Sequence, residues 1–211
     1  MVVAAISVVA AHRADGDRAP TAIRTEQPAK QQAMKLQKIK TIARHLWFDA
    51  SDAKRAISPA ILQRLADRVA ASERRHTGQI RIYVEAAMPL SYVTRLDRHV
   101  RLKNIVRERA VMQFGKLQVW DTAQNNGVLI YLLLAEHAIE IVADRGLSLH
   151  VSAEQWQQVV ARMAATFQQK RFEEGLGQAL EEVSTLLVAY FPASQDGPGR
   201  INELPDTPFL G

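Results

Sequence analysis

The sequence contains no cysteine among its 211 residues. This absence excludes a disulfide scaffold, a thiolate metal site and a cysteine nucleophile. Aromatic residues make up only 6% of the chain and do not alternate with a basic face, so we expect no nucleic acid as a partner. No stretch approaches the roughly 20 apolar residues that span a bilayer. We therefore expect a cytoplasmic protein or, alternatively, one peripheral to a membrane.

The signature motifs of common enzyme classes are also missing. The chain has no glycine-rich phosphate loop, no nucleophile elbow and no H-E-x-x-H zinc pair. Gly175-Leu176-Gly177 opens a predicted helix that no strand precedes, so it is not a dinucleotide fingerprint. We expect no nucleotide cofactor, and the sequence alone establishes no catalytic activity.

The apolar content of 47% is sufficient for one core, and the length suits one domain with tails. The net charge of +5 is placed unevenly. Residues 1–57 carry ten Lys or Arg against five Asp or Glu, whereas residues 58–211 carry seventeen of each. The excess positive charge therefore precedes the domain.

Composition divides the chain into four parts. Residues 1–33 are rich in Ala, Pro, Gln and charge, which predicts a disordered extension. Residues 34–57 form a basic amphipathic helix and linker, and Met34 resembles a natural beginning of the folded part. Residues 58–191 carry the pattern of an α/β domain, and residues 192–211 are predicted to be a flexible C-terminal tail.

The helix predicted over residues 34–48 has two interpretations. Its apolar residues gather on one arc, with lysine and arginine at the borders and on the far side. This pattern is typical of a helix that packs its apolar side onto the domain. It is equally the pattern of a helix that rests on an anionic membrane surface, which would make residues 34–48 a peripheral membrane contact.

The order of elements within the domain predicts the fold class. A helix from residue 58 leads into an alternating strand at 80–85, and residues 91–114 suit two shorter helices or one helix with a bend. A continuous apolar run at 128–134 and a second strand at 138–143 predict a hairpin, and two amphipathic helices follow. We expect an α/β fold, a three-layer α/β/α sandwich in which a small mixed sheet is flanked by helices. A right-handed crossover would make the first two strands parallel and the third antiparallel.

Polar side chains cluster where these strands begin and end. Asp121, Asn125 and Asn126 precede the buried strand, and Asp144 leaves its hairpin partner, so all four should meet at one edge of the sheet. Carboxylate and amide oxygens suit Ca²⁺ or Mg²⁺, which predicts a metal site formed by these four residues.

Two further residues are candidates at the same edge. Arg145 and His76 are expected to contact a phosphate group or a partner. The alternative interpretation of the whole cluster is turn formation, because Asn, Asp and Gly tolerate left-handed backbone geometry. His76 would then be a residue at the C-terminus of a helix, near its dipole.

Four segments together resemble the TPM domain, in its short bacterial form: residues 76–85 (HTGQIRIYVE), 119–122 (VWDT), 125–132 (NNGVLIYL) and 139–146 (IEIVADRG). The resemblance covers about residues 58–190 and implies an α/β sandwich. The family includes thylakoid proteins described as acid phosphatases, membrane-anchored members with adaptor-like roles, and members that bind divalent cations. It thereby implies a site role for Asp121, Asn125, Asn126 and Asp144.

The leading hypothesis for function is thus a TPM-type binding or adaptor module for a protein partner that the sequence does not identify, with a divalent cation at the loop edge. The alternative is a metal-assisted acid phosphatase that acts on phosphomonoesters.

Overall fold

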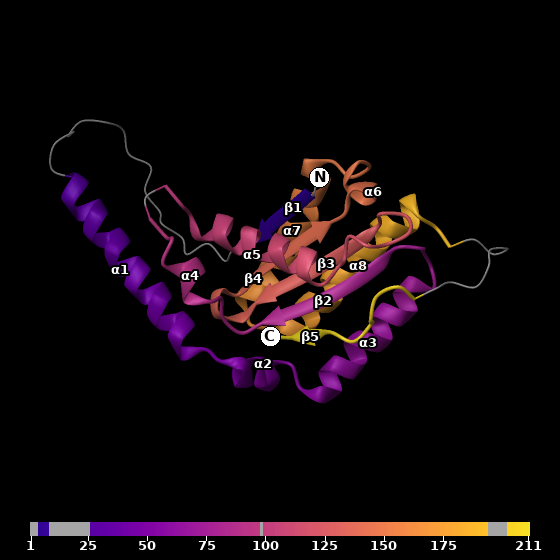
Figure 1. The fold of residues 1–211 in the computed structure, drawn as a ribbon, viewed down its shortest axis with the longest axis horizontal. Coiled ribbons are helices and arrows are strands. Elements are labelled where there is room, and N and C mark those ends of the chain that lie inside the picture. The colour runs from indigo at the N-terminus through magenta and orange to yellow at the C-terminus, as the bar shows by residue number, and fades with distance from the viewer. Residues whose placement is uncertain (1–3, 9–25, 98, 194–201) are drawn as a thin grey trace.

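A computed structural model describes residues 4–8, 26–97, 99–193 and 202–211 (Figure 1). The elements, in chain order, are β1 (Ala4–Val8), α1 (Glu26–Trp47), α2 (Ala50–Ala56), α3 (Pro59–Glu73), β2 (Gln79–Glu85), α4 (Leu90–Val93), α5 (Leu102–Lys116), β3 (Gly127–Leu133), a 3₁₀ turn η1 (Leu134–Glu136), β4 (Ala138–Ala143), α6 (Arg145–Ser148), α7 (Ala153–Gln168), α8 (Phe172–Tyr190) and β5 (Phe209–Leu210). The predicted pair of short helices is confirmed as α4 and α5.

The sheet has the strand order β1-β4-β3-β2-β5. Strands β2 and β3 are parallel, with Gln79 opposite Gly127, because α4 and α5 form the long crossover that parallel strands require. Strands β3 and β4 are antiparallel, with Val128 opposite Ala143, because η1 is short enough for a hairpin. The predicted strand directions are therefore confirmed. The starts of β2 and β3 and the end of β4 share one edge of the sheet.

Helices cover both faces of the sheet, which confirms the predicted three-layer sandwich. Alternate residues of a strand point to opposite faces, so β2 sends Ile82 and Tyr83 into different cores. Ile82 packs with the apolar faces of α3, α7 and α8. Tyr83 packs on the other side with α4 and α5. Every residue of β2, β3 and β4 is buried, as expected for central strands covered on both faces.

Local capping signals fix where the helices begin. The Oγ atom of Ser58 accepts a hydrogen bond from Ile61 N at 3.4 Å, and proline occupies the first position of α3. Before α7, Ser152 and Gln155 exchange two hydrogen bonds, of 2.8 and 3.3 Å, in a capping box. These signals are local in sequence, so the helix starts follow from a few residues each.

Both ends of the chain differ from the prediction. Part of the expected extension, Ala4–Val8, pairs with β4 as an edge strand, and α1 begins at Glu26. Part of the expected tail, Phe209–Leu210, pairs with Tyr83 and Val84 of β2, and Leu204 is buried. The physical reason is that β2 and β4 would otherwise present unpaired backbone groups along their open sides. Residues 9–25 and 194–201 of the predicted extension and tail lie outside the described residues.

Helix α1 packs differently from the first interpretation of its pattern. The residues that it buries are polar, Thr41 and His45, whereas Leu46 and Trp47 are exposed. The Nε2 atom of His45 donates to Glu136 at 3.1 Å, because its Nδ1 atom accepts from Met88 N at 3.0 Å. Arg44 donates to the other carboxylate oxygen of Glu136 at 2.7 Å. A buried carboxylate needs such partners, so Glu136 determines which side of α1 faces the domain.

Candidate functional site

Three loops meet at the edge where β2 and β3 begin and β4 ends, and the C-terminal segment joins them at Glu203. We name this region the loop edge (residues 77, 121–126, 144–146 and 203). Backbone hydrogen bonds join them, from Asp144 N to Gly127 O at 2.9 Å and from Gly146 N to Asn125 O at 2.8 Å. The structure thus brings together Asn125, Asp144 and Arg145, although about twenty residues separate the two loops.

The close approach of these loops depends on two backbone positions. Asn125 has a φ angle of 52°, in the left-handed region that asparagine tolerates better than most residues. A Cβ atom on Gly146 would lie 2.4 Å from Asn125 O and 2.8 Å from Gln124 O. Only glycine therefore allows these two carbonyl oxygens to lie so close to the start of α6.

Asn126 holds the loop to the start of β2. It is buried, and its Nδ2 atom donates to Thr77 Oγ1 at 3.2 Å and to Gln124 Oε1 at 3.3 Å. Thr77 in turn donates to Gln124 Oε1 at 2.7 Å. The backbone N–H of Asn126 donates to Thr122 Oγ1 at 3.1 Å. This closed network gives Asn126 a structural role at the loop edge.

Asp144 presents the most unusual group of the site. The residue is only 3% exposed, and its Oδ1 atom accepts from Arg145 N at 2.7 Å. Its Oδ2 atom is buried and has no hydrogen-bond partner among the residues that the structure describes. A buried carboxylate oxygen without a partner is costly, because the charge has lost its water and gained nothing in return. An oxygen in this position could accept a bond from a cation.

Arg145 extends from the same turn into solvent. Its Nη2 atom donates to Asn125 Oδ1 at 2.7 Å, and the side chain is exposed. A guanidinium carries five N–H donors, so this single bond leaves others free for an oxyanion. The expected contact of Arg145 with a phosphate group or a partner stays a prediction.

The structure does not bring the other two predicted residues into this group. Asp121 is exposed after α5, and within the described part of the chain its carboxylate makes no hydrogen bond or ion pair. His76 is fully buried: its Nδ1 atom donates to Gly78 O at 3.1 Å, so its Nε2 atom accepts from Ser72 Oγ at 3.0 Å. His76 therefore cannot contact a ligand at the surface, and this expectation is wrong.

Glu203 is a residue of the loop edge that the sequence did not reveal. Its carboxylate accepts from Ala123 N at 3.3 and 3.2 Å, and the backbone N–H groups of Glu203 and Leu204 donate to Gln79 Oε1 at 3.1 and 3.2 Å. The segment looked like a tail because Pro and Asp interrupt it. The spaced apolar residues Leu204 and Phe209 were the only signal of packing.

Oxygen atoms suited to a metal ion lie at the loop edge: Asp144 Oδ2, and the carbonyl oxygens of Gln124 and Asn125 beside Gly146. Oxygen donors suit a hard cation such as Ca²⁺ or Mg²⁺. Among the residues that the structure describes, no three or more His, Asp or Glu side chains form a metal cluster. A cation here would therefore rely on one buried carboxylate supplemented by main-chain oxygens.

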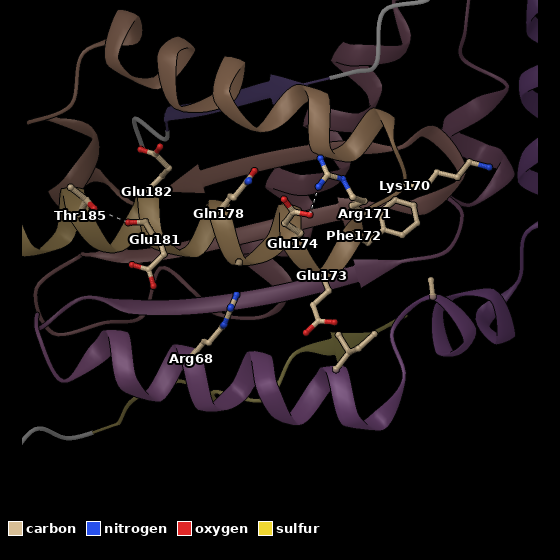
Figure 2. A pocket seen from close by; sticks show the side chains of 13 residues that line it. Arg68, Lys170, Arg171, Phe172, Glu173, Glu174, Gln178, Glu181, Glu182 and Thr185 are labelled. Atoms are coloured by element: carbon tan, nitrogen blue, oxygen red, sulfur yellow. Dashed lines mark hydrogen bonds and ion pairs between the residues drawn. The ribbon is translucent and has the colours of Figure 1, made fainter.

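A groove of about 900 Å³ lies elsewhere, between α3 and α8 (Figure 2). Its walls carry glutamates of α8, and arginines neutralise most of them. Arg64 binds Glu173 with two bonds of 2.7 and 2.9 Å, and this hydrogen bonding lowers the pKa of Glu173. Arg171 binds Glu174 at 2.6 Å. Because these charges satisfy one another, we place the candidate site at the loop edge.

None of the helices in the described residues combines the length and the apolar character needed to cross a membrane.

No curated protein matches the chain.

Comparison with known proteins agrees with the fold. The NMR structure of BA42 protein from the psychrophilic bacterium Bizionia argentinensis sp. nov. is similar, with a TM-score of 0.60 and 26% sequence identity. The match covers 74% of this chain and 95% of BA42. The model of the TPM domain matches residues 50–186, from the start of α2 into α8 and across the whole loop edge except the C-terminal segment. The chain therefore belongs to the TPM domain family.

Proposed function

We propose that the chain is a TPM-type binding module whose loop edge holds Ca²⁺ or Mg²⁺ and contacts a protein partner. The observation that supports the proposal is the buried Oδ2 atom of Asp144, for which the described part of the chain provides no hydrogen-bond partner. A cation at this atom would compensate the buried charge. It would also draw the carbonyl oxygens of Gln124 and Asn125 toward the same point and so fix the three loops relative to one another.

The surface around this point suits a partner. Arg145 and Asp121 are exposed and of opposite charge, and Trp120, which directly precedes Asp121, is 41% exposed. Exposed aromatic and arginine side chains are enriched at protein interfaces. By contrast, the buried residues Asn126 and Thr122 hold the loops in place. The loop edge thus combines a rigid interior with a polar, aromatic surface.

The second candidate function is a metal-assisted acid phosphatase that acts on phosphomonoesters. The exposed guanidinium of Arg145 supports it, because arginine binds phosphate oxygens through paired hydrogen bonds. A bound divalent cation would supply Lewis-acid polarisation of a phosphoryl oxygen. Arg145 would bind and orient the phosphate group, held in place by its bond to Asn125.

The test is a thermal melt of the full chain with and without Ca²⁺ or Mg²⁺. A ligand that binds only the folded state stabilises it by about 2.7 kcal/mol at 100 times its Kd. For a chain of this size that gain raises Tm by roughly 5–10 °C. Asp144→Asn keeps an oxygen to accept from Arg145 N but removes the charge, so we expect it to fold and to lose the gain.

The matched control is Asp67→Asn on α3, which removes one carboxylate charge far from the loop edge and keeps an oxygen for Gln63. We expect it to respond to the cation like the wild type. Asp121→Asn shows whether Asp121 is also a ligand. Hydrolysis of a phosphomonoester that requires the cation and is lost in Asp144→Asn and in Arg145→Gln would favour the phosphatase. The absence of any stabilisation by either cation would reject the metal site.

A further inference from the structure

The strongest feature outside the loop edge is the outward face of α1. The helix attaches at the opposite end of the strands, where Glu136 follows β3, and Figure 1 shows it on the outer side of α4. Its attachment is polar: Thr41 and His45 face the domain, and Lys38 donates to Thr94 O at 2.6 Å. An amphipathic helix of a globular protein normally buries its apolar side, whereas α1 packs the partly buried Ile42 against the core and leaves most of its apolar residues exposed.

The side of α1 opposite this attachment is apolar. At 3.6 residues per turn, its apolar residues lie within an arc of about 100°. They are strongly exposed, with fractions of 53% for Leu36, 61% for Ile39, 64% for Leu46 and 86% for Trp47. Ala43 lies in the middle of the same arc and is also exposed. We name this surface, formed by Leu36, Ile39, Ala43, Leu46 and Trp47, the outer face of α1.

The charges around the outer face are of one sign. Residues 27–48 contain five Lys or Arg and no Asp or Glu. Lys35 and Lys40 border the apolar arc on its two sides, and neither has a partner among the described residues.

We propose that the outer face of α1 binds the surface of an anionic lipid bilayer. An apolar strip with lysines at both borders is the arrangement of a helix that lies in the membrane interface. The lysine stems can extend along the apolar strip and place their ammonium groups at the anionic headgroups. Trp47 has the amphipathic ring that prefers the interface.

The charge pattern favours lipid over a second copy of the chain. A symmetric dimer would bring two outer faces together, and with them two lysine borders. Since residues 27–48 contain no carboxylate, the lysine borders of the outer face would meet only basic borders on the partner's outer face. An anionic bilayer supplies the opposite charge along the whole length of the strip.

The experiment is flotation of the full chain with vesicles of phosphatidylcholine alone or of phosphatidylcholine with phosphatidylglycerol. We expect binding to the anionic vesicles only, and weaker binding at high salt because the lysine contribution is screened. Lys35→Gln/Lys40→Gln should weaken binding by about 30-fold, from roughly 1 kcal/mol for each lysine near an anionic surface. Ile39→Gln/Leu46→Gln should weaken it at least tenfold.

Matched controls change equivalent residues elsewhere. Lys54→Gln/Lys116→Gln removes two exposed lysines, and Val111→Gln/Leu149→Gln removes two exposed apolar side chains, all outside α1. Both controls should bind like the wild type. The proposal is rejected if the chain does not bind anionic vesicles, or if the α1 variants bind as well as their controls. It is also rejected if ultracentrifugation shows a dimer that the Ile39→Gln/Leu46→Gln variant dissociates, since a second copy would then cover the outer face.

Discussion

The ion pair between Glu85 and Arg109 allows a quantitative test of the core opposite α8. Glu85 ends β2, and its side chain is 5% exposed; Arg109 lies on α5 with 12% exposed. The guanidinium binds both carboxylate oxygens, with Nε to Oε2 at 2.9 Å, and the hydroxyl of Tyr131 donates to Oε2 at 2.6 Å. Burial opposes the charge of Arg109, but the hydrogen bond and charge of Glu85 outweigh it and raise the pKa of the guanidinium.

Removal of Arg109 alone should lower the stability of the fold more than removal of both charges of the pair. Arg109→Met leaves the carboxylate buried without its cation, which typically lowers the free energy of unfolding by about 3–5 kcal/mol. For a chain of this length, that corresponds to a fall in Tm of roughly 6–20 °C. Glu85→Gln should lower the free energy of unfolding by less, about 1–3 kcal/mol. The amide oxygen of the glutamine still accepts from Tyr131, and the side chain of Arg109 is long enough to reach solvent.

The assay is urea unfolding followed by circular dichroism, applied to both single variants and to Glu85→Gln/Arg109→Met. The double variant contains no buried charge at this position, so we expect it to be more stable than the sum of the single changes predicts, by about 1–3 kcal/mol. Strictly additive effects, or a loss below about 1 kcal/mol for Arg109→Met, would refute the view that Glu85 is charged and desolvated in the folded protein.

Three further predictions concern stability. Leu204→Ala should lower the free energy of unfolding by about 2–3 kcal/mol in the same assay, since Leu204 is buried. A change within about 0.5 kcal/mol would indicate that the C-terminal segment around Leu204 does not pack on the domain. Gly146→Ala should lower the free energy of unfolding by about 1–3 kcal/mol, because its Cβ would overlap Asn125 O. Gly115→Ala has nothing within 4 Å of the added Cβ, so it should be neutral or stabilise α5 by up to about 1 kcal/mol. Equal effects of the two substitutions would contradict the close approach of the loops. Burial, assisted by the charge of Glu85, raises the pKa of Tyr83 to about 12, so the unfolded chain loses this proton first and stability should fall as pH rises from about 10 to 12. Burial also raises the pKa of Tyr131, so spectrophotometric titration should show late tyrosines, and Tyr83→Phe should reduce the late signal by one tyrosine.

The sequence predicted the central sheet because its signals are local and redundant. The run at residues 128–134 is apolar at every position, and the hairpin into the next strand is short, so strand type and direction followed from adjacent residues. The helix starts at Ser58 and Ser152 were equally local. Periodicity likewise identified the residues that share one side of α1.

Periodicity could not show which way that side faces. The orientation of α1 depends on Glu136, a carboxylate about ninety residues later in the chain that takes His45 and Arg44 as partners. At the loop edge, sequence spacing brought Asn125 and Asp144 together, but it gave no measure of burial. It therefore could not separate the buried His76 and Asp144 from the exposed Asp121.

The positions of β1 and β5 have a consequence for any fragment cut to the limits of the family match. Residues 50–186 include β2, β3 and β4 but neither of the strands that flank them. In such a fragment β4 and β2 would each offer a free row of N–H and C=O groups, both on strands whose residues are all buried in the whole chain. Free edges of this kind pair readily with other chains. We expect the fragment to aggregate under conditions in which the full chain stays dispersed.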